Sequence, residues 1–282
     1  MQRESLVDRL ALAATALLLV SPALAYLTGL WVPYWRLVTM LGYEEAYVAL
    51  AVIVYVALSP QLGYYMLLSL LTSAWVNAYL KNTLALPRPP PEQWKVQETG
   101  YGFPSGHAQV STSFWSTASL KLRRASLAVL SATLVALISI SRLELGVHYP
   151  RDVAGGVLIG LAVALASYYL AGWLLRADKR AAFTATLLYS LLVATLYLIQ
   201  PDATILKAAG VLAGASLYPL VKDKVKPSPS VARRTALTAL ALAVALALTQ
   251  LAKTASPPAQ LATYLAISLV IIATPLAHSK QR

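Results

Sequence analysis

The sequence predicts an all-α fold, a polytopic bundle of membrane-spanning helices, on three observations. Hydrophobic residues make up 58% of the 282 residues, while Asp, Glu, Lys and Arg together make up 12%, about half the charged share of a soluble domain. Apolar runs close to the ~20 residues that cross a bilayer as a helix recur along the chain. Lys and Arg collect in every second connection between these runs, as the positive-inside rule requires of a membrane protein.

Ten segments approach the length of a spanning helix. They are Leu10–Leu30, Ala46–Leu58, Tyr64–Leu80, Gly106–Leu120, Ala125–Ile140, Val153–Leu175, Ala182–Ile199, Ala203–Val221, Ala236–Ala252 and Ala259–Ala277. The first six of these segments lie within residues 1–178, and the last four lie within residues 179–282. The fourth segment is rich in Ser and Thr, so we expect it to lie buried, where small hydroxylated residues let helices approach closely. A re-entrant or interfacial segment is the alternative.

The basic residues predict how the chain is oriented. The net charge of +12 comes from 23 Lys and Arg against 11 Asp and Glu. With the N-terminus in the cytoplasm, fifteen of the 23 fall on the cytoplasmic side and eight on the outer side. The bias predicts a multi-pass protein of the cell membrane with both termini in the cytoplasm. Because the loops account for the basic excess, no nucleic-acid partner is expected.

The start of the chain also fits a cleaved signal peptide. Leu10–Val20 is an apolar run, and Ala23-Leu24-Ala25 is similar to a cleavage site. Glu4 and Asp8 weaken the basic segment that precedes such a run. We therefore expect an uncleaved first span.

Two further patterns predict packing and depth. Trp31 and Trp35 follow the first span and are expected in the aromatic belt at the membrane interface. Gly156 and Gly160, and likewise Gly210 and Gly214, are spaced for close contact between helices.

Cysteine and histidine usage narrows the chemistry. The chain has no cysteine, which excludes disulfides, Cys-ligated zinc and thiol catalysis. Its three histidines are His107, His148 and His278. The first two lie in loops that the charge bias places outside.

Those two outer loops hold a set of polar residues at the rim of an apolar bundle. The set reads Lys81-x6-Arg88-Pro89, Pro104-Ser105-Gly106-His107 and Ser141-Arg142-x5-His148-x3-Asp152. Ionisable groups at membrane depth are costly and usually mark a function. Taken singly, each of these residues could be a helix cap or an anchor that reaches the membrane surface. Because they occur together on one side of the bilayer, they favour a functional site.

Five of these residues are suited to hold a phosphate group. Lys81, Arg88 and Arg142 offer a point charge and two planar guanidinium forks to its oxygens. Ser105 and Gly106 stand where the fourth helix is expected to begin, so unpaired backbone N–H groups face a bound anion there. Gly106 also lets the anion approach the backbone.

The histidines and Asp152 are suited to covalent catalysis. Pro150 is expected to open the sixth span, with His148 just before it and Asp152 in its first turn. Asp152 then accepts from one ring nitrogen of His148 and leaves the other as a nucleophile. His107, at the start of the fourth span, is placed to act as general acid.

The three segments resemble, without a substitution, the signature of the type 2 phosphatidic acid phosphatase superfamily. The resemblance covers roughly Tyr47–Leu175 and implies a six-helix phosphatase core followed by a multi-span extension. It implies that His148 attacks phosphorus, that Asp152 orients it, and that His107 protonates the leaving group and later activates water. The remaining residues that it assigns to phosphate binding are Lys81, Arg88, Ser105, Gly106 and Arg142. The family also contains soluble vanadium haloperoxidases, against which the apolar spans argue.

The implied reaction is hydrolysis of a lipid phosphate or diphosphate through a phosphohistidine, with no cofactor. No metal is expected, because Asp152 and Glu144 are too few carboxylates for a Mg²⁺ site in these loops. The expected partners are a lipid phosphate substrate and membrane lipids; the sequence does not indicate an oligomeric state. Polyprenyl diphosphate or a glycerolipid phosphate ranks first. The alternatives are a lipid phosphotransferase and a non-catalytic phosphate-binding protein or transporter.

Overall fold

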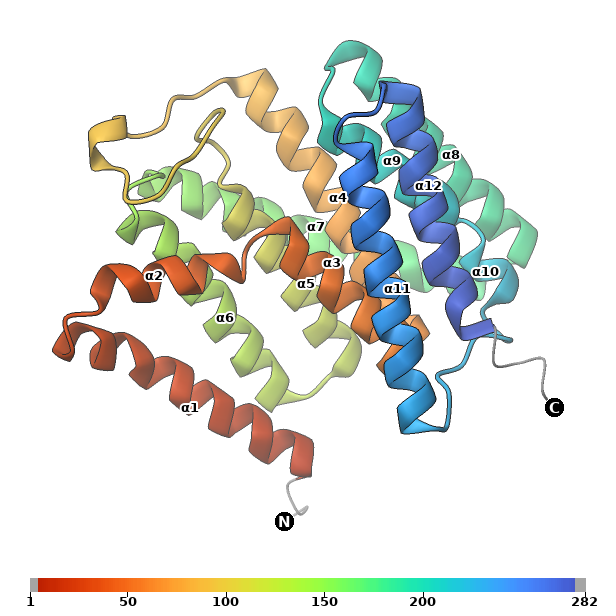
Figure 1. The fold of residues 1–282 in the computed structure, drawn as a ribbon, viewed down its shortest axis with the longest axis horizontal. Helices are drawn as coiled ribbons and strands as arrows, with labels where there is room; N and C mark the ends of the chain where they lie inside the picture. The colour runs from red at the N-terminus through yellow and green to blue at the C-terminus, as the bar shows by residue number, and fades with distance from the viewer. Residues whose placement is uncertain (1–4, 277–282) are drawn as a thin grey trace. The chain divides into compact units, whose positions relative to one another are not determined.

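The computed structural model describes residues 5–276, and within them the chain is helical without a β-strand. Arg3, Glu4, His278, Lys280 and Arg282, which entered the sequence predictions, lie outside the described residues. The helices, coloured along the chain in Figure 1, are α1 (Leu6–Leu27), α2 (Trp31–Met40), α3 (Glu44–Ile53), α4 (Pro60–Leu84), α5 (Gly106–Leu122), α6 (Ala125–Glu144), α7 (Pro150–Arg176), α8 (Lys179–Ile199), α9 (Ala203–Ala215), α10 (Tyr218–Val221), α11 (Val231–Ala252) and α12 (Pro257–Ala273). A π-helical turn, η1 (Val54–Leu58), extends α3, and a 3₁₀ turn, η2 (Pro91–Gln93), lies in the loop after α4. The predicted all-α class is confirmed.

Seven helical stretches of the described chain are long and apolar enough to cross a membrane. They are α1, α6, α7, α8, α9 with α10, α11, and α12 extended to Leu276. The stretch Trp31–Met40 and Glu44–Leu58, bent by 51°, adds an eighth if the pair is one span. The predicted segments Tyr64–Leu80 and Gly106–Leu120 are helical, as α4 and α5, but stand outside this group. That these two cross the bilayer stays a prediction.

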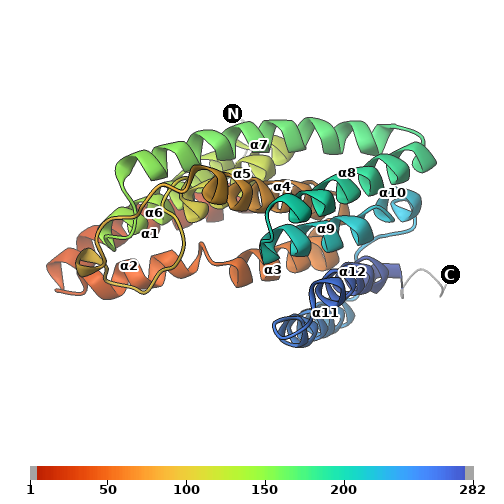
Figure 2. The ribbon, with the colours of Figure 1, turned by 90° about the horizontal axis from the view of Figure 1, so that it is seen from above.

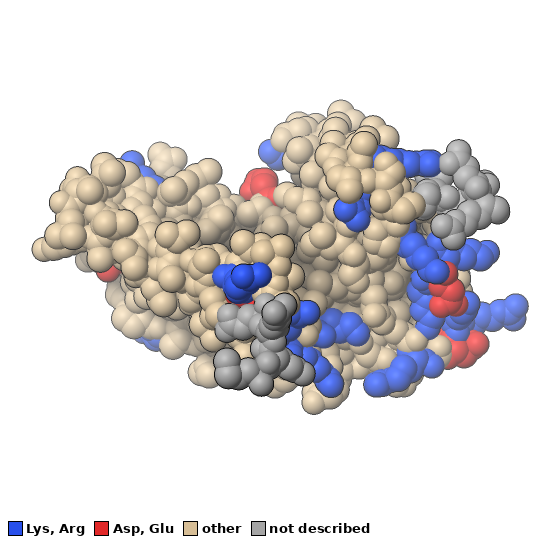
Figure 3. All heavy atoms as spheres, turned by 90° about the horizontal axis from the view of Figure 1, so that it is seen from below, with Lys and Arg blue, Asp and Glu red and all other residues tan. Residues whose placement is uncertain are grey.

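The surface fits a multi-pass membrane protein. Leu17 and Leu27 on α1 and Leu198 on α8 are largely exposed, which is unfavourable in water and favourable against lipid. Figure 3 shows broad areas without charge, with Lys and Arg side chains gathered in groups.

The described chain divides into two compact units. Among residues 5–276, the first unit comprises residues 5–47 and 80–166, and the second comprises residues 48–79 and 167–276. The predicted division at residue 178 stays a prediction.

In the first unit, α6 packs against α1, α2 and α5; Figures 1 and 2 both show α1, α2 and α6 side by side. Trp35 of α2 is 3% exposed and packs with Val38, Leu137, Leu145 and Val147. Its expected place in an interfacial belt is therefore wrong: the indole fills the core between α2 and α6.

Helix α7 lies close to α5 because two glycines leave room. A Cβ on Gly156 would stand 2.7 Å from the Ser105 carbonyl oxygen, and one on Gly160 would stand 2.5 Å from that of Gln109. The predicted close contact through this glycine pair is confirmed, and it fixes the start of α5 against the first turns of α7.

In the second unit, α9 packs between α8 and α12, and α11 packs beside α12. A Cβ on Gly210 would stand 2.6 Å from the Leu261 carbonyl oxygen of α12. Gly214 similarly faces Ser268 of α12 at 2.5 Å. The second predicted glycine contact is thus confirmed as internal packing of this unit.

Candidate active site

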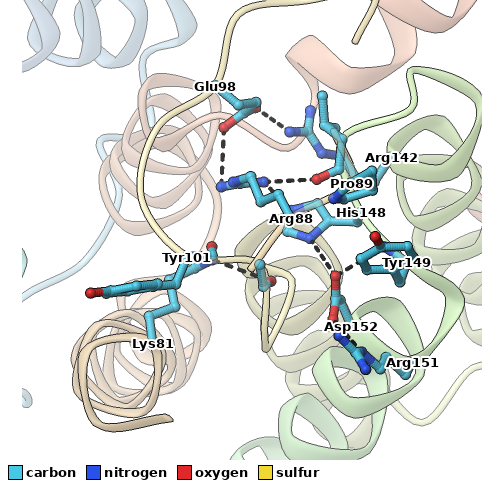
Figure 4. A network of polar contacts seen from close by, with 12 residues as sticks. Lys81, Arg88, Pro89, Glu98, Tyr101, Arg142, His148, Tyr149, Arg151 and Asp152 are labelled. Atoms are coloured by element: carbon cyan, nitrogen blue, oxygen red, sulfur yellow. Dashed lines mark hydrogen bonds and ion pairs between the residues drawn. The ribbon is translucent and has the colours of Figure 1, made fainter. Parts of the chain in front are cut away.

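The predicted site residues meet in the first unit although they come from separate stretches of chain (Figure 4). Lys81 lies in the last turn of α4, Arg88 in the loop after it, Arg142 in the last turn of α6, and His148 and Asp152 around the start of α7. Ser105, Gly106 and His107 begin α5. The Ser105 backbone N–H donates to the Asp152 carbonyl oxygen at 2.9 Å and joins the two helix starts.

His148 is oriented by the first turn of α7. Pro150 opens the helix, as predicted, and Asp152 follows in its first turn. One carboxylate oxygen of Asp152, Oδ2, accepts from the Tyr149 N–H at 2.9 Å and lies 3.4 Å from Nδ1 of His148. This oxygen therefore satisfies an orphan N–H of the helix start and faces one ring nitrogen.

The turn that brings His148 to α7 depends on Gly146. Its φ of +71° lies in the left-handed region that glycine adopts without strain. A Cβ at this position would strike the Gln93 carbonyl. The Lys95 N–H donates to the Leu145 carbonyl oxygen at 3.0 Å, so the loop after α4 is fastened to this turn.

Arg88 fixes the tautomer of His148. Its Nη1 lies 2.8 Å from Nε2 of His148 and also donates to the Val147 carbonyl oxygen at 3.0 Å. Because a guanidinium only donates hydrogen bonds, Nε2 must be the acceptor. The proton of the neutral ring therefore sits on Nδ1, toward Asp152, and Nε2 carries the lone pair.

The site favours the neutral form of this ring. Burial lowers the pKa of His148 to about 4; the hydrogen bond with Asp152 opposes the shift and the Arg88 cation adds to it. At neutral pH the ring is therefore uncharged, and its unprotonated nitrogen is available.

Arg142 is the most enclosed cation of the site, with a fully buried side chain. Its Nη1 donates to the Thr39 hydroxyl of α2 at 2.6 Å, and its Nη2 forms an ion pair with Glu98. Its Nε has no hydrogen-bond partner among the described residues.

Lys81 and Arg88 are both held by carbonyls of the same loop. The Lys81 ammonium donates to the Tyr101 carbonyl oxygen at 2.6 Å. Arg88 donates to those of Gly100 at 3.1 Å and Thr99 at 2.9 Å. The loop thus sets the positions of two cations.

The start of α5 presents polar atoms with no partner. Ser105 caps the helix by position but makes no side-chain hydrogen bond. Its buried Oγ and the buried Nε2 of His107 lack a hydrogen-bond partner within residues 5–276, which is unusual for buried polar atoms. His107 meets the Tyr43 ring edge-on, with centroids 5.2 Å apart, and lies within electrostatic reach of Arg142 and His148.

One family model matches the part of the chain that holds these residues. The model of the PAP2 superfamily matches residues 62–176, a range that holds all eight predicted site residues. The match to the PAP2 superfamily model thus covers about two fifths of the chain. The resemblance drawn from the three motif segments is confirmed.

The relatives differ in how much of their length they share with this chain. Decaprenylphosphoryl-5-phosphoribose phosphatase of Mycobacterium tuberculosis, from strain CDC 1551 / Oshkosh and from strain ATCC 25618 / H37Rv, is 42% identical over 78 residues in each case. The match covers 28% of this chain and 42% of the relative, so the chain spans less than half the length of these curated relatives. A transmembrane PAP2-type phosphatidylglycerolphosphate phosphatase from Bacillus subtilis, known from a crystal structure, is 23% identical. That likeness covers 58% of this chain and 86% of the other, with a TM-score of 0.44.

Three residues around the site were not predicted from the sequence. Glu98 pairs with Arg142 through Oε1 and with Arg88 through Oε2, the latter at 3.4 Å. Glu98 lies between the first two motif segments, so its place near the site could have been inferred from the sequence. The argument against a Mg²⁺ site considered only Asp152 and Glu144. Thr39 and Tyr43 gave no signal, because they precede the motifs by dozens of residues. Among the described residues, no group of three or more His, Cys, Asp or Glu is placed to hold a metal ion.

An open groove of about 710 Å³ lies between the loop after α4 and residues near α2. It is lined by Arg36, Tyr43, Pro91, Trp94, Lys95, Val96 and Gln97. Arg36 donates to the Lys95 carbonyl oxygen at 2.7 Å, and the Lys95 ammonium donates to that of Glu144 at 2.7 Å. Tyr43, one of the lining residues, also meets the ring of His107, the residue predicted to be the general acid.

Proposed function

We propose that this protein removes the terminal phosphoryl group of a membrane lipid phosphate or diphosphate through a phosphohistidine on His148. The observation that carries the proposal is the pairing of His148, whose Nδ1 faces Asp152 while Nε2 presents its lone pair to the Arg88 guanidinium. A neutral histidine held by a carboxylate on one side and a phosphate-binding cation on the other is the arrangement that nucleophilic attack on phosphorus requires.

In the first step, phosphoryl oxygens bind Arg88, Arg142 and Lys81. Arg88 exchanges its hydrogen bond with Nε2 for one with a phosphoryl oxygen, which brings phosphorus to the lone pair. The bond from Nε2 of His148 to phosphorus forms as the bond from phosphorus to the leaving oxygen breaks. The ring becomes a phosphorylated imidazolium, whose positive charge the Asp152 carboxylate stabilises.

His107 supplies the proton for the leaving oxygen. Its Nε2 is buried and has no hydrogen-bond partner in the described chain, so this nitrogen is available to a bound substrate. The groove beside Tyr43 gives the departing headgroup a place to lie. General acid catalysis from this nitrogen neutralises the leaving alkoxide or phosphate.

In the second step, His107 takes a proton from a water molecule, and the oxygen of that water attacks the phosphohistidine. The bond from Nε2 to phosphorus breaks, inorganic phosphate leaves, and His148 returns to its neutral form. The three cations hold the phosphoryl oxygens throughout, so this chain's own residues provide the charge stabilisation for both steps.

A lipid substrate is supported by the setting of the site and by the relatives. The exposed leucines of α1 and α8 place the protein among lipids, and the Mycobacterium tuberculosis relatives are named for a decaprenylphosphoryl sugar phosphate. We therefore rank polyprenyl phosphates and diphosphates first and glycerolipid phosphates second. In the proposed orientation both termini are cytoplasmic and the site faces outward.

Phosphate release in detergent tests the proposal. The purified chain is assayed against polyprenyl diphosphate, polyprenyl phosphate, phosphatidate and a long-chain base phosphate, each with wild-type protein and with the His148→Ala variant. We expect release by wild type alone, insensitive to EDTA and inhibited by vanadate. Arg180→Ala is the matched control, because Arg180 is an exposed arginine of the second unit.

Three results would contradict the proposal. They are release by His148→Ala at the wild-type rate, strict Mg²⁺ dependence, and transport of a lipid phosphate without any release. Transfer of the phosphoryl group to an added alcohol in place of water would identify a phosphotransferase with the same intermediate.

A further inference from the structure

Residues 39–43 end α2 and lead into α3, and we call this segment the elbow. The helical stretches that it joins, Trp31–Met40 and Glu44–Leu58, are bent by 51° relative to each other (Figure 1). The Gly42 N–H donates to the Thr39 carbonyl oxygen at 2.9 Å, so the backbone of the bend is itself held by a hydrogen bond. The elbow belongs to the first unit and precedes residues 62–176, the range that the family model matches.

The elbow packs directly against the ring of His107. A Cβ on Gly42 would stand 2.4 Å from Cδ2 of His107 and 3.0 Å from Cγ2 of Ile138 on α6. No side chain therefore fits between the elbow backbone and the imidazole. Tyr43 contacts the same ring edge-on, with the centroids 5.2 Å apart and the planes at 76°. Two consecutive residues of the elbow thus limit how the His107 ring can turn.

This packing bears on proton transfer because of the ring atom that it contacts. Cδ2 is bonded to Nε2, the nitrogen that we propose as the proton donor to the leaving oxygen. Nε2 has no hydrogen-bond partner in the part of the chain that the structure describes, whereas the ring of His148 is faced by Asp152. A general acid must lie within hydrogen-bond reach of the atom that it protonates, so a displacement of this edge of the ring affects proton transfer.

The elbow also holds one cation of the phosphate site. The Thr39 hydroxyl accepts from Nη1 of Arg142 at 2.6 Å, and both side chains are buried. Removal of the hydroxyl would take a hydrogen-bond acceptor from a guanidinium that is enclosed by protein, which is costly for a buried charged donor. One short segment therefore contacts both the residue proposed to protonate the leaving oxygen and a residue proposed to bind the phosphoryl oxygens.

We propose that the elbow is a positioning element of the reaction. Gly42 and Tyr43 orient Nε2 of His107 toward the leaving oxygen, and Thr39 fixes the guanidinium of Arg142 for the phosphoryl oxygens. The three residues act through His107 and Arg142 and do not react themselves. The inference rests on the proposed function, because it assigns the supports of two residues of that reaction.

First-turnover kinetics with two matched substrates test the inference. One is an alkyl phosphate, whose leaving alkoxide needs a proton. The other is a nitrophenyl phosphate with the same alkyl chain on its ring, whose leaving phenolate needs none. Each is mixed with excess protein in detergent micelles, and release of the alcohol or phenol is followed. Since this release reports formation of the phosphohistidine, the later attack by water does not contribute.

Gly42→Ala is the first variant, because its methyl group displaces the His107 ring. We expect the rate constant for the alkyl phosphate to fall by about 10²-fold, and that for the nitrophenyl phosphate by less than about threefold. His107→Ala is the reference and should show the same selective loss. Gly172→Ala is the matched control, because its methyl would meet only the Tyr65 hydroxyl and the end of Arg176. Equal losses on both substrates in folded Gly42→Ala, or no loss on either, would overturn the inference.

Tyr43→Ala provides a second variant in case Gly42→Ala does not fold. It removes the edge contact with the His107 ring and introduces no steric clash. The rate constant for the alkyl phosphate should fall by about tenfold, with less than about threefold loss for the nitrophenyl phosphate. Tyr43→Phe keeps the aromatic ring and should recover most of the lost rate. A Tyr43→Ala variant that slows both substrates equally, or neither of them, contradicts the proposed role.

Thr39→Val tests the support of Arg142, since valine has nearly the same shape but no hydroxyl. Loss of a phosphate-binding group should slow both substrates alike and weaken inhibition by vanadate, a phosphate mimic, by about tenfold. Thr39→Ser keeps the hydroxyl and should restore vanadate inhibition. Wild-type vanadate inhibition in Thr39→Val, or equal weakening in Thr39→Ser, would remove Thr39 from the proposal.

The reference variant separates failure of this inference from failure of the proposed function. If His107→Ala slows both substrates equally, His107 is not the general acid, and the proposed mechanism falls together with the inference. If His107→Ala shows the selective loss and neither Gly42→Ala nor Tyr43→Ala does, the proposed function stands and the positioning role of the elbow is wrong.

Discussion

Arg88 donates a hydrogen bond to Nε2 of His148 over 2.8 Å, while Asp152 faces Nδ1 of the same ring at 3.4 Å. The proposed nucleophile is thereby held in one tautomer from both sides before any substrate arrives. Arg88 is also one of the cations proposed to bind the phosphoryl oxygens. When these oxygens bind, they draw Arg88 away from Nε2, and the nitrogen becomes free to attack the phosphorus that approaches it.

Replacing Arg88 by Lys keeps the positive charge but removes the planar guanidinium group with its several N–H donors. A lysine cannot serve the carbonyls of Val147, Gly100 and Thr99 and the ring nitrogen at once. We expect kcat to fall by about 10²-fold or more, with the protein still folded. The measurement is steady-state phosphate release. Arg180→Lys, at an exposed arginine of the second unit, is the control. Activity of Arg88→Lys within about threefold of wild type would show that the planar guanidinium is dispensable.

The protonation of His148 predicts a pH profile. The folded pKa is lowered to about 4, so acidification from pH 7 to 5 should leave the ring neutral and nucleophilic. Protonation, and with it loss of the lone pair, is expected only as pH falls through about 4. Nitrogen-15 NMR of labelled histidine in detergent measures this, with the signal assigned by its absence in His148→Ala. A midpoint near 6.5, the usual histidine value, would mean that the site does not exclude water from the ring.

The close contact between α5 and α7 predicts that a substitution away from the catalytic residues lowers the stability of the protein. In Gly160→Ala the new methyl would stand 2.5 Å from the Gln109 carbonyl oxygen, so the helices must separate. Overpacking of this kind costs about 1–3 kcal/mol, and the shift should also move His107 and reduce kcat. Thermal unfolding in detergent and phosphate release are the two measurements. Gly172→Ala is the matched control, because its methyl meets only the Tyr65 hydroxyl and the end of Arg176; equal unfolding temperatures would contradict the packing account.

The orientation can be tested directly because the chain has no cysteine. A single cysteine in place of Glu92, in the loop of the site, should react with a membrane-impermeant thiol reagent applied to whole cells. A cysteine in place of Lys224, in the basic loop before α11, should react only after the cells are permeabilised. Both positions are exposed. The reverse pattern would invert the proposed topology.

The site was accessible to sequence reasoning because its residues stand at helix ends. Pro150 marks the start of α7, so the spacing of His148 and Asp152 predicts that they face each other across the first turn. Ser105 and Gly106 mark the start of α5 in the same way. Signals of this kind depend on a few neighbouring residues, so they can be recognised in the sequence without knowledge of the tertiary structure.

Other features depend on tertiary contacts that leave no local pattern. Helix α2 was not predicted, and its Trp35 was expected at the membrane interface because nothing in the sequence shows that α6 covers it. Thr39 reaches Arg142 only through that packing. Glu98 was overlooked for a related reason: an acidic residue in a polar loop is ordinary until the fold brings two buried arginines to its oxygens.

Trapping of the phosphoenzyme by an alkaline denaturing quench tests the central claim most directly. The protein is mixed for milliseconds with a phosphorus-32-labelled lipid phosphate, quenched, and digested at alkaline pH, where phosphohistidine survives. The account predicts label on the peptide that holds His148 in wild type, no label in His148→Ala, and longer-lived label in His107→Ala with a substrate whose leaving group needs no proton. Phosphate release with label on another residue, or with no labelled protein at any time, would contradict it.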